Sequence, residues 1–232
     1  MHHLFLPLAA VLSLSSASAA VIRIDFGSAT NTTTEAGVTW NNLTGTTVGS
    51  NIANLTDIGG TTTGFSIEVT GAFRGTNTSG TTTSTLFPAN ATRDSFYGHT
   101  IASASFPAPT FPDGQLTLNG LNAFETYTLR FYASRTGDSV NRATLYTADG
   151  GNGAQSAALN ANNVNGSVVI SGLTADANGR IVIDVDPGAG NTTTEQFYYI
   201  GVLEVTSVPE PAASSVMIAS LAACLLRRKR NA

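Results

Sequence analysis

The amino-acid sequence predicts an all-β protein, an antiparallel β-sandwich of jelly-roll type, and three observations support this prediction. Apolar and polar residues alternate in several segments, which is typical of strands with one buried and one solvated face. Between residues 21 and 206, no window keeps apolar residues at helical spacing. Pairs of Gly, Asn and Asp separate the segments as turns would, and the pattern predicts about ten or eleven strands.

The alternating segments run through most of the chain. In the first, Ile22, Ile24 and Phe26 share one face, while Arg23 and Asp25 share the other. The same alternation recurs in three later segments, which are residues 65–70, 127–133 and 181–185. Each is therefore expected to bury one face against a second sheet.

A final segment, residues 197–205, is apolar on both faces, which predicts a central strand covered on both sides or a strand under a loop. In a jelly roll the first and last strands can pair antiparallel, which would bring residues 21–26 beside this segment. Two Thr-rich stretches, residues 44–63 and 76–85, fit strands through Thr and loops through Gly and Asn, so both alternatives stay open.

The N-terminus has the pattern of a secretory signal peptide, assigned to residues 1–19. A mostly apolar stretch from Leu4 to Leu14 is followed by small residues with an Ala-x-Ala ending, just before the first strand. The start carries His in place of the usual Lys or Arg. A buried N-terminal helix is the alternative interpretation.

The C-terminus, residues 208–232, has three parts in a fixed order. The motif Val208, Pro209, Glu210, Pro211 precedes an apolar stretch, residues 212–226, which predicts a short transmembrane helix. A basic stop-transfer cluster follows, suited to the cytoplasmic side of a membrane, and consists of Arg227, Arg228, Lys229 and Arg230.

This tail resembles the PEP-CTERM sorting signal of Gram-negative bacteria. The resemblance implies an exosortase, an intramembrane cysteine transpeptidase, as a partner that cuts the tail. It also implies that the chain is held in the inner membrane before processing. Afterwards the body, residues 20–207, would lie at the cell surface or outside the cell, often with exopolysaccharide. A plain single-span anchor is the alternative.

The composition excludes several classes of protein. The predicted body contains seven Arg, no Lys and 14 acidic residues, a net charge of −7 that argues against a nucleic-acid partner. The one Cys of the chain, Cys224, lies in the tail, so the body has neither a disulfide framework nor a Cys-based zinc site. The absence of thiols suits export to an oxidising compartment.

A second resemblance covers roughly residues 110–206 and is to galactose-binding-like jelly rolls. Its segments are Gly120-Leu121, residues 126–135, Asn141-Arg142, residues 171–173, Asn178-Gly179 and residues 198–205. Related modules occur beside extracellular hydrolases and in adhesion repeats. Such a fold alone does not imply sugar binding, because many of these modules are structural.

No catalytic residue is predicted. His99 is the only His of the body, no Cys accompanies it, and no Gly-x-Ser-x-Gly motif is present. Asp184 and Asp186 share one strand face and could bind Ca²⁺ through their oxygens, which is the one cofactor considered. Alternatives for this pair are two solvated acids or the carboxylates of a glycoside hydrolase.

Carbohydrate binding would require an aromatic platform and hydrogen-bond donors. The candidates are Trp40 and Tyr132 as rings, with Tyr97 and Tyr146 as further aromatics, and Arg135 and Arg142 as donors. Trp40 could instead belong to the core.

The sequence therefore predicts an exported, non-catalytic protein of the cell surface or exopolysaccharide matrix, structural with weak carbohydrate binding. The alternatives are a lectin-like carbohydrate-binding module and a hydrolase of matrix glycans.

Overall fold

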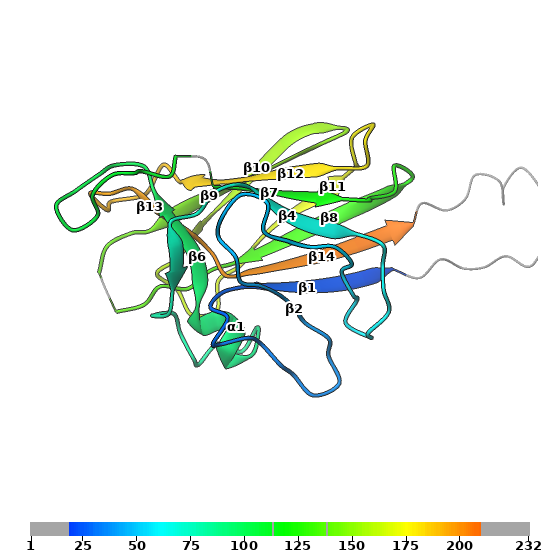
Figure 1. The fold of residues 1–232 in the computed structure, drawn as a ribbon, viewed down its shortest axis with the longest axis horizontal. Coiled ribbons are helices and arrows are strands. Elements are labelled where there is room, and N and C mark those ends of the chain that lie inside the picture. The colour runs from blue at the N-terminus through cyan, green and yellow to red at the C-terminus, as the bar shows by residue number, and fades with distance from the viewer. Residues whose placement is uncertain (1–18, 113, 138, 210–232) are drawn as a thin grey trace, which may run out of the picture.

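A computed structural model describes residues 19–112, 114–137 and 139–209, which form a mostly β body (Figure 1). All strand pairs except β1–β2 are antiparallel. The strands are β1 (Ala20–Phe26), β2 (Asn41–Leu43), β3 (Asn51–Ile52), β4 (Ser66–Gly71), β5 (Gly75–Asn77), β6 (Ser95–His99), β7 (Gly114–Asn119), β8 (Glu125–Tyr132), β9 (Ala143–Gly150), β10 (Gly153–Asn160), β11 (Val168–Leu173), β12 (Ile181–Pro187), β13 (Phe197–Ile200) and β14 (Val202–Pro209), with one short helix, α1 (Ala89–Arg93).

The strands form three sheets. A five-stranded sheet has the order β11-β8-β14-β1-β2, and a six-stranded sheet has the order β10-β9-β12-β7-β4-β3. A small third sheet, β13-β6-β5, lies at the left end in Figure 1, away from the end where the described chain starts and finishes. This small sheet is called the end sheet below.

The two large sheets share one hydrophobic core, as the alternation predicts. Ile22, Ile24 and Phe26 of β1 pack in the same cluster as the apolar residues of β4, β7 and β12, and these β1 side chains are at most 1% exposed. Between the sheets, the ring of Phe131 on β8 stacks on Tyr146 of β9, with centroids 4.4 Å apart and planes at 9°. Burial of these faces supplies most of the stability of the fold.

The first and last strands pair antiparallel, as expected. β1 and β14 lie side by side from Ala20↔Ser207 to Asp25↔Val202. Both ends of the described body therefore leave from the same end of the molecule (Figure 1). Val208 and Pro209 of the predicted sorting motif form the last residues of β14, whereas Glu210, Pro211 and the rest of the tail lie outside the described residues.

Residues 197–205 form two strands in different sheets, not one. β13 belongs to the end sheet, while β14 is central between β8 and β1, and the chain passes from one to the other at Gly201. A Cβ at this position would lie 3.1 Å from the carbonyl oxygen of Asp94 and 3.3 Å from that of Tyr132. Every residue from 197 to 205 is buried except Glu204, which pairs with Arg23, and this explains why the segment is otherwise apolar.

Three other features differ from the expectation. β1 and β2 pair in parallel, the helix α1 is present, and the described residues contain more strands than the pattern predicts. The extra strands are mainly β2, β3 and β5, which have only two or three residues each. Elements this short are held by tertiary contacts and have no periodicity to detect.

No helix within the described residues has the length and apolar character that crossing a membrane requires. The predicted transmembrane segment, residues 212–226, and nearly all of the predicted signal peptide lie outside those residues.

Replacing Phe131 by Ala should lower the free energy of unfolding by about 3–5 kcal/mol, because it empties a fully buried ring site between the sheets. The matched control is Phe124→Ala, since Phe124 is 83% exposed and its loss should cost less than about 0.5 kcal/mol. Urea unfolding followed by circular dichroism measures both. Equal effects of the two substitutions would contradict this packing.

Candidate functional site

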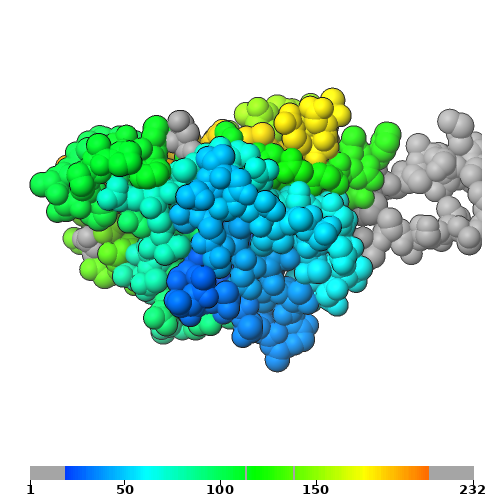
Figure 2. Space-filling view, in the orientation of Figure 1, coloured from blue at the N-terminus to red at the C-terminus, as the bar shows by residue number. Residues whose placement is uncertain are grey.

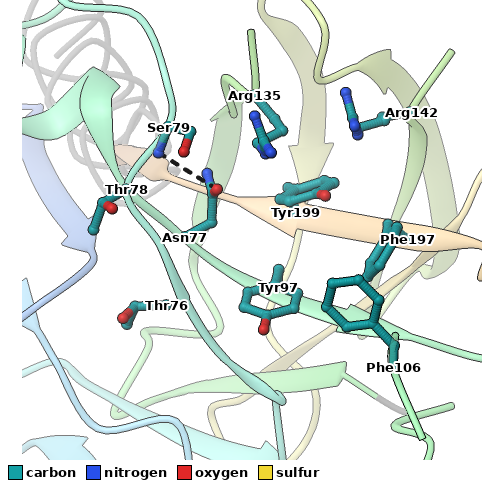
Figure 3. Close-up of a pocket in the computed structure, with 10 residues that line it drawn as sticks. All are labelled: Thr76, Asn77, Thr78, Ser79, Tyr97, Phe106, Arg135, Arg142, Phe197 and Tyr199. Atoms are coloured by element: carbon teal, nitrogen blue, oxygen red, sulfur yellow. Dashed lines mark hydrogen bonds between the residues drawn. The ribbon is translucent and has the colours of Figure 1, made fainter. Parts of the chain in front are cut away.

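A pocket of about 320 Å³ lies on the end sheet, at the opposite end of the body from its two termini. Four parts of the chain form it: β5 with the residues after it, the paired strands β6 and β13, the loop between β6 and β7, and the segment between β8 and β9 (Figure 3). The lining residues are Thr76, Asn77, Thr78, Ser79, Tyr97, Phe106, Arg135, Arg142, Phe197 and Tyr199.

Two tyrosine rings form the aromatic part of this pocket. Tyr97 and Tyr199 are directly paired across β6 and β13, and their rings lie 6.2 Å apart at an angle of 25°. Phe197 precedes Tyr199 by two residues and therefore projects from the same face of β13. Residues between and after them, Tyr198 and Ile200, belong to the core. A strand that is apolar on both faces thus serves the pocket with one face and the core with the other.

A loop between β6 and β7 closes one side of the pocket. Phe106 in this loop contacts Phe197 edge to face, with ring centroids 4.7 Å apart. Figure 2 shows the green surface of this loop at the left end of the molecule. The loop is held by Ser103, whose hydroxyl donates to Glu195 at 2.7 Å. The loop thereby packs an aromatic ring against the Phe197 side of the pocket.

The polar side of the pocket carries positive charge. Arg135 and Arg142 lie next to Tyr199 in Figure 3, and Nη1 of Arg135 donates to the carbonyl of Thr136 at 2.8 Å. Burial raises the pKa of Tyr199, and the two guanidinium groups oppose that rise. The Tyr199 hydroxyl therefore stays protonated at neutral pH and can donate a hydrogen bond.

Residues 76–79 complete the pocket with hydroxyl and amide groups. Thr76 and Asn77 end β5, and Thr78 and Ser79 follow it; the amide of Ser79 donates to Oδ1 of Asn77 at 3.4 Å (Figure 3). Thr, Asn and Ser side chains both donate and accept hydrogen bonds. The pocket therefore combines ring faces, cationic donors and neutral polar groups.

The structure brings together Arg135 and Arg142, the two predicted donors, and adds Tyr97 to them. The two rings predicted as a platform, Trp40 and Tyr132, lie elsewhere, in a buried cluster with Phe87, Ala91 and Val202. Tyr132 is fully buried and Trp40 is 9% exposed. The prediction that they present ring faces to solvent is therefore wrong, and the core interpretation of Trp40 is confirmed.

The reason is that the chain segment around α1 covers this face of the five-stranded sheet. Phe87 meets Trp40 edge to face at 6.0 Å and Tyr132 at 5.6 Å. The polar atoms of the two rings are also engaged: Trp40 Nε1 donates to Glu35 at 2.9 Å, and the Tyr132 hydroxyl donates to the Val164 carbonyl at 2.9 Å. Nothing in local alternation indicates that residues 86–93 return to this surface.

Tyr146 is buried and supports the pocket from within. Its hydroxyl donates to the carbonyl of Tyr199 at 2.7 Å, which ties β9 to β13. His99 is also buried and has two partners, because Nε2 accepts from Arg74 at 3.1 Å and Nδ1 donates to the carbonyl of Ile101 at 3.0 Å. His99 therefore has the structural role expected for a single His.

Tyr199, Phe197, Phe106 and residues 76–79 are pocket residues that the sequence analysis did not identify. The aromatic residues at 197 and 199, two apart on a strand, were a usable signal for a shared face. The contribution of residues 76–79 has no local signal, because the pairing of β5 with β6 depends on tertiary structure.

Asp184 and Asp186, the predicted Ca²⁺ ligands, lie two residues apart on β12. Oδ1 of Asp184 accepts a hydrogen bond from Gln115 at 2.7 Å. In the part of the chain that the structure describes, no group of three or more His, Cys, Asp and Glu side chains is placed to hold a metal ion. Calcium binding at this pair stays a prediction.

A different pair of carboxylates, Asp25 and Asp94, is buried. Asp25 is 2% exposed and Asp94 is fully buried, so the prediction of a solvated face at Asp25 is wrong. Burial, together with the smaller effect of the nearby Asp94 and against the opposing effect of Thr33, raises the pKa of Asp25 to about 7. Burial also raises the pKa of Asp94, whose Oδ2 accepts from the amide of Ser28 at 2.7 Å.

No family model matches the chain, and no curated protein or solved structure is significantly similar to it.

The buried carboxyl of Asp25 should make stability depend on pH when divalent cations are removed with EDTA. Its pKa lies above the unfolded value of 3.8, so the folded state takes up the proton first. The contribution of the Asp25 carboxyl group to the free energy of unfolding is fully present below pH 4. It is lost as pH rises to about 7, which lowers the free energy of unfolding by up to about 4 kcal/mol.

The measurement is urea unfolding of the wild type and of Asp25→Asn at pH 4, 5, 6 and 7. Taking the difference between the two proteins removes the contributions of other titrating groups. As pH rises, the free energy of unfolding of the variant should increase relative to that of the wild type. A difference between the two proteins that stays constant with pH would show that Asp25 is not buried in this way.

Proposed function

We propose that this chain is an exported, non-catalytic protein of the cell surface or exopolysaccharide matrix, and that the pocket on its end sheet binds carbohydrate weakly. The observation that carries the proposal is the ring of Tyr97, which stacks on the buried ring of Tyr199 and lines one pocket with the guanidinium groups of Arg135 and Arg142. Sugar rings present apolar C–H faces together with hydroxyls, so they need both kinds of surface at one place.

The dimensions of the pocket suit a small part of a glycan. At about 320 Å³ it is at the lower end of the range for ligand pockets, which fits one sugar unit at a chain end or branch. The hydroxyl and amide groups of residues 76–79 line the same pocket as the arginines and can accept or donate at the sugar hydroxyls. Weak binding follows from the small area that one unit buries.

The position of the pocket supports a role at a surface. The body begins and ends at one end of the sandwich, and the pocket lies at the other (Figure 1). A chain attached through its C-terminal sorting signal would therefore direct the pocket away from the membrane. Sorting by an exosortase and the jelly-roll assignment belong to this proposal, and the antiparallel β1–β14 pair and facing sheets support the latter.

Glycan binding should depend on Tyr97 and Arg135. We expect binding of the purified full-length chain to a glycan array, and Tyr97→Ala and Arg135→Ala should each weaken it at least about tenfold, because they remove a ring face and a cationic donor. Arg180→Ala is the matched control, since Arg180 pairs with Asp176 and does not line the pocket. An array without binding, or equal binding by all four proteins, would rule out this function.

The sorting motif has its own test. Replacing Pro209, Glu210 and Pro211 by Ala should stop tail cleavage, so that a tagged chain accumulates uncut in the inner-membrane fraction of its native host. The wild-type chain should appear shortened at the cell surface or in the medium. Cleavage of the triple variant at the wild-type rate, or cytosolic uncut wild type, would contradict exosortase sorting.

A further inference from the structure

Three buried oxygen atoms near the end of β1 have no hydrogen-bond partner within the described residues. They are Oδ1 of Asp25, Oδ1 of Asp94 and Oγ1 of Thr33, and each of these residues is at most 2% exposed. Buried polar atoms in proteins are nearly always satisfied by a hydrogen bond or an ion, and an unsatisfied one is costly. Three such atoms indicate a partner that the protein chain does not supply.

The three side chains belong to one place. Gly27 follows Asp25 by two residues, so a side chain there would project on the same side of the strand as that of Asp25. That space is taken by Asp94, because a Cβ at Gly27 would collide with the Asp94 carboxyl group. The two carboxyl groups are therefore neighbours, which agrees with the effect of Asp94 on the pKa of Asp25.

Thr33 lies on the other side of Asp25. Its amide and hydroxyl groups both lower the pKa of Asp25, so both are close to that carboxyl group, although the hydroxyl forms no hydrogen bond of good geometry. The Thr33 backbone is fixed by Asn42, whose side chain accepts from the Thr33 amide at 2.6 Å and donates to its carbonyl at 3.2 Å. These two hydrogen bonds hold Thr33 beside Asp25.

No positive side chain neutralises this pair. Within the part of the chain that the structure describes, neither Asp25 nor Asp94 forms an ion pair. Burial raises the pKa of Asp94; the neutral Ser28 amide and Asn31 side chain oppose that rise more than the charge of Arg93 does. Two buried carboxylates without a counter-charge require either a cation or a proton. An arrangement of two carboxylates and a hydroxyl provides only oxygen ligands, which is the preference of Ca²⁺.

We propose that Asp25, Thr33 and Asp94 bind one Ca²⁺ ion at the end of β1. Ca²⁺ takes about six to eight oxygens, so backbone carbonyls and water complete its shell. The ion links the end of β1, the following loop and the residue before β6, three segments that are far apart in sequence. The site is distinct from the pocket and does not depend on the proposed function.

Calcium titration of the purified full-length chain tests this site. After removal of metal with EDTA, isothermal titration calorimetry with CaCl₂ at pH 7.5 should show one site, and Ca²⁺ should raise the thermal unfolding midpoint. Asp25→Asn and Asp94→Asn should each weaken Ca²⁺ at least about 100-fold, and Thr33→Val about tenfold, because each removes an oxygen ligand or its charge.

Asp184→Asn is the matched control, because it removes the same charge from the carboxylate pair on β12. It should bind Ca²⁺ as the wild type does. Loss of binding in Asp184→Asn with binding retained in Asp25→Asn would overturn the proposal in favour of the β12 pair. Circular dichroism confirms that each variant is folded; if the Asp variants are not, Thr33→Val and the control still decide the site.

A proton shared by the two carboxyl groups is the competing occupant. It predicts no heat on adding CaCl₂ and an unfolding midpoint that Ca²⁺ leaves unchanged at pH 7.5, and that result would overturn the calcium site. With Ca²⁺ as the occupant, affinity should fall at least about tenfold from pH 7.5 to pH 5.5, because protons compete for the carboxylates. An affinity that does not change over this range would also count against these ligands.

Discussion

The close backbone packing at Gly201 is the constraint on which the arrangement of this protein depends. Its amide donates to the Tyr132 carbonyl at 2.9 Å, and its carbonyl accepts from the Phe26 amide at 2.8 Å. The carbonyl oxygen of Asp94, the residue before β6, would lie 3.1 Å from a Cβ at this position, so the residue is close to β8, β1 and the start of β6. A side chain here would be in tight contact with two backbone carbonyls at the point where the chain passes from the end sheet into the sandwich.

Two groups of ionisable side chains lie on segments that meet at this junction. On one side, β13 leads to a pocket with two guanidinium groups and two tyrosine rings. On the other, Asp25 near the end of β1 and Asp94 before β6 form a buried pair of carboxyl groups. Asp94 comes directly before β6, the strand that carries Tyr97.

Two residues of the pocket could be predicted from the sequence because few side chains of their charge are present. Arg135 and Arg142 are two of only seven cationic side chains in the body, and a polar ligand site would need such donors. The rings were not predictable in the same way. Tyr132 at the end of β8 and Trp40 just before β2 are covered by residues 86–93, whereas Tyr97 and Tyr199 face a pocket that forms only when β13 pairs with β6.

The sequence by itself determined the all-β character of the body and which apolar side chains of the alternating segments are buried. These follow from alternation, a local property that each strand shows along its own length. Only the tertiary structure decided that residues 197–205 divide between two sheets, that Asp25 is buried, and that the pocket lies on β5, β6 and β13. Those outcomes depend on which distant segments cover a given face, and no local pattern of residues records that.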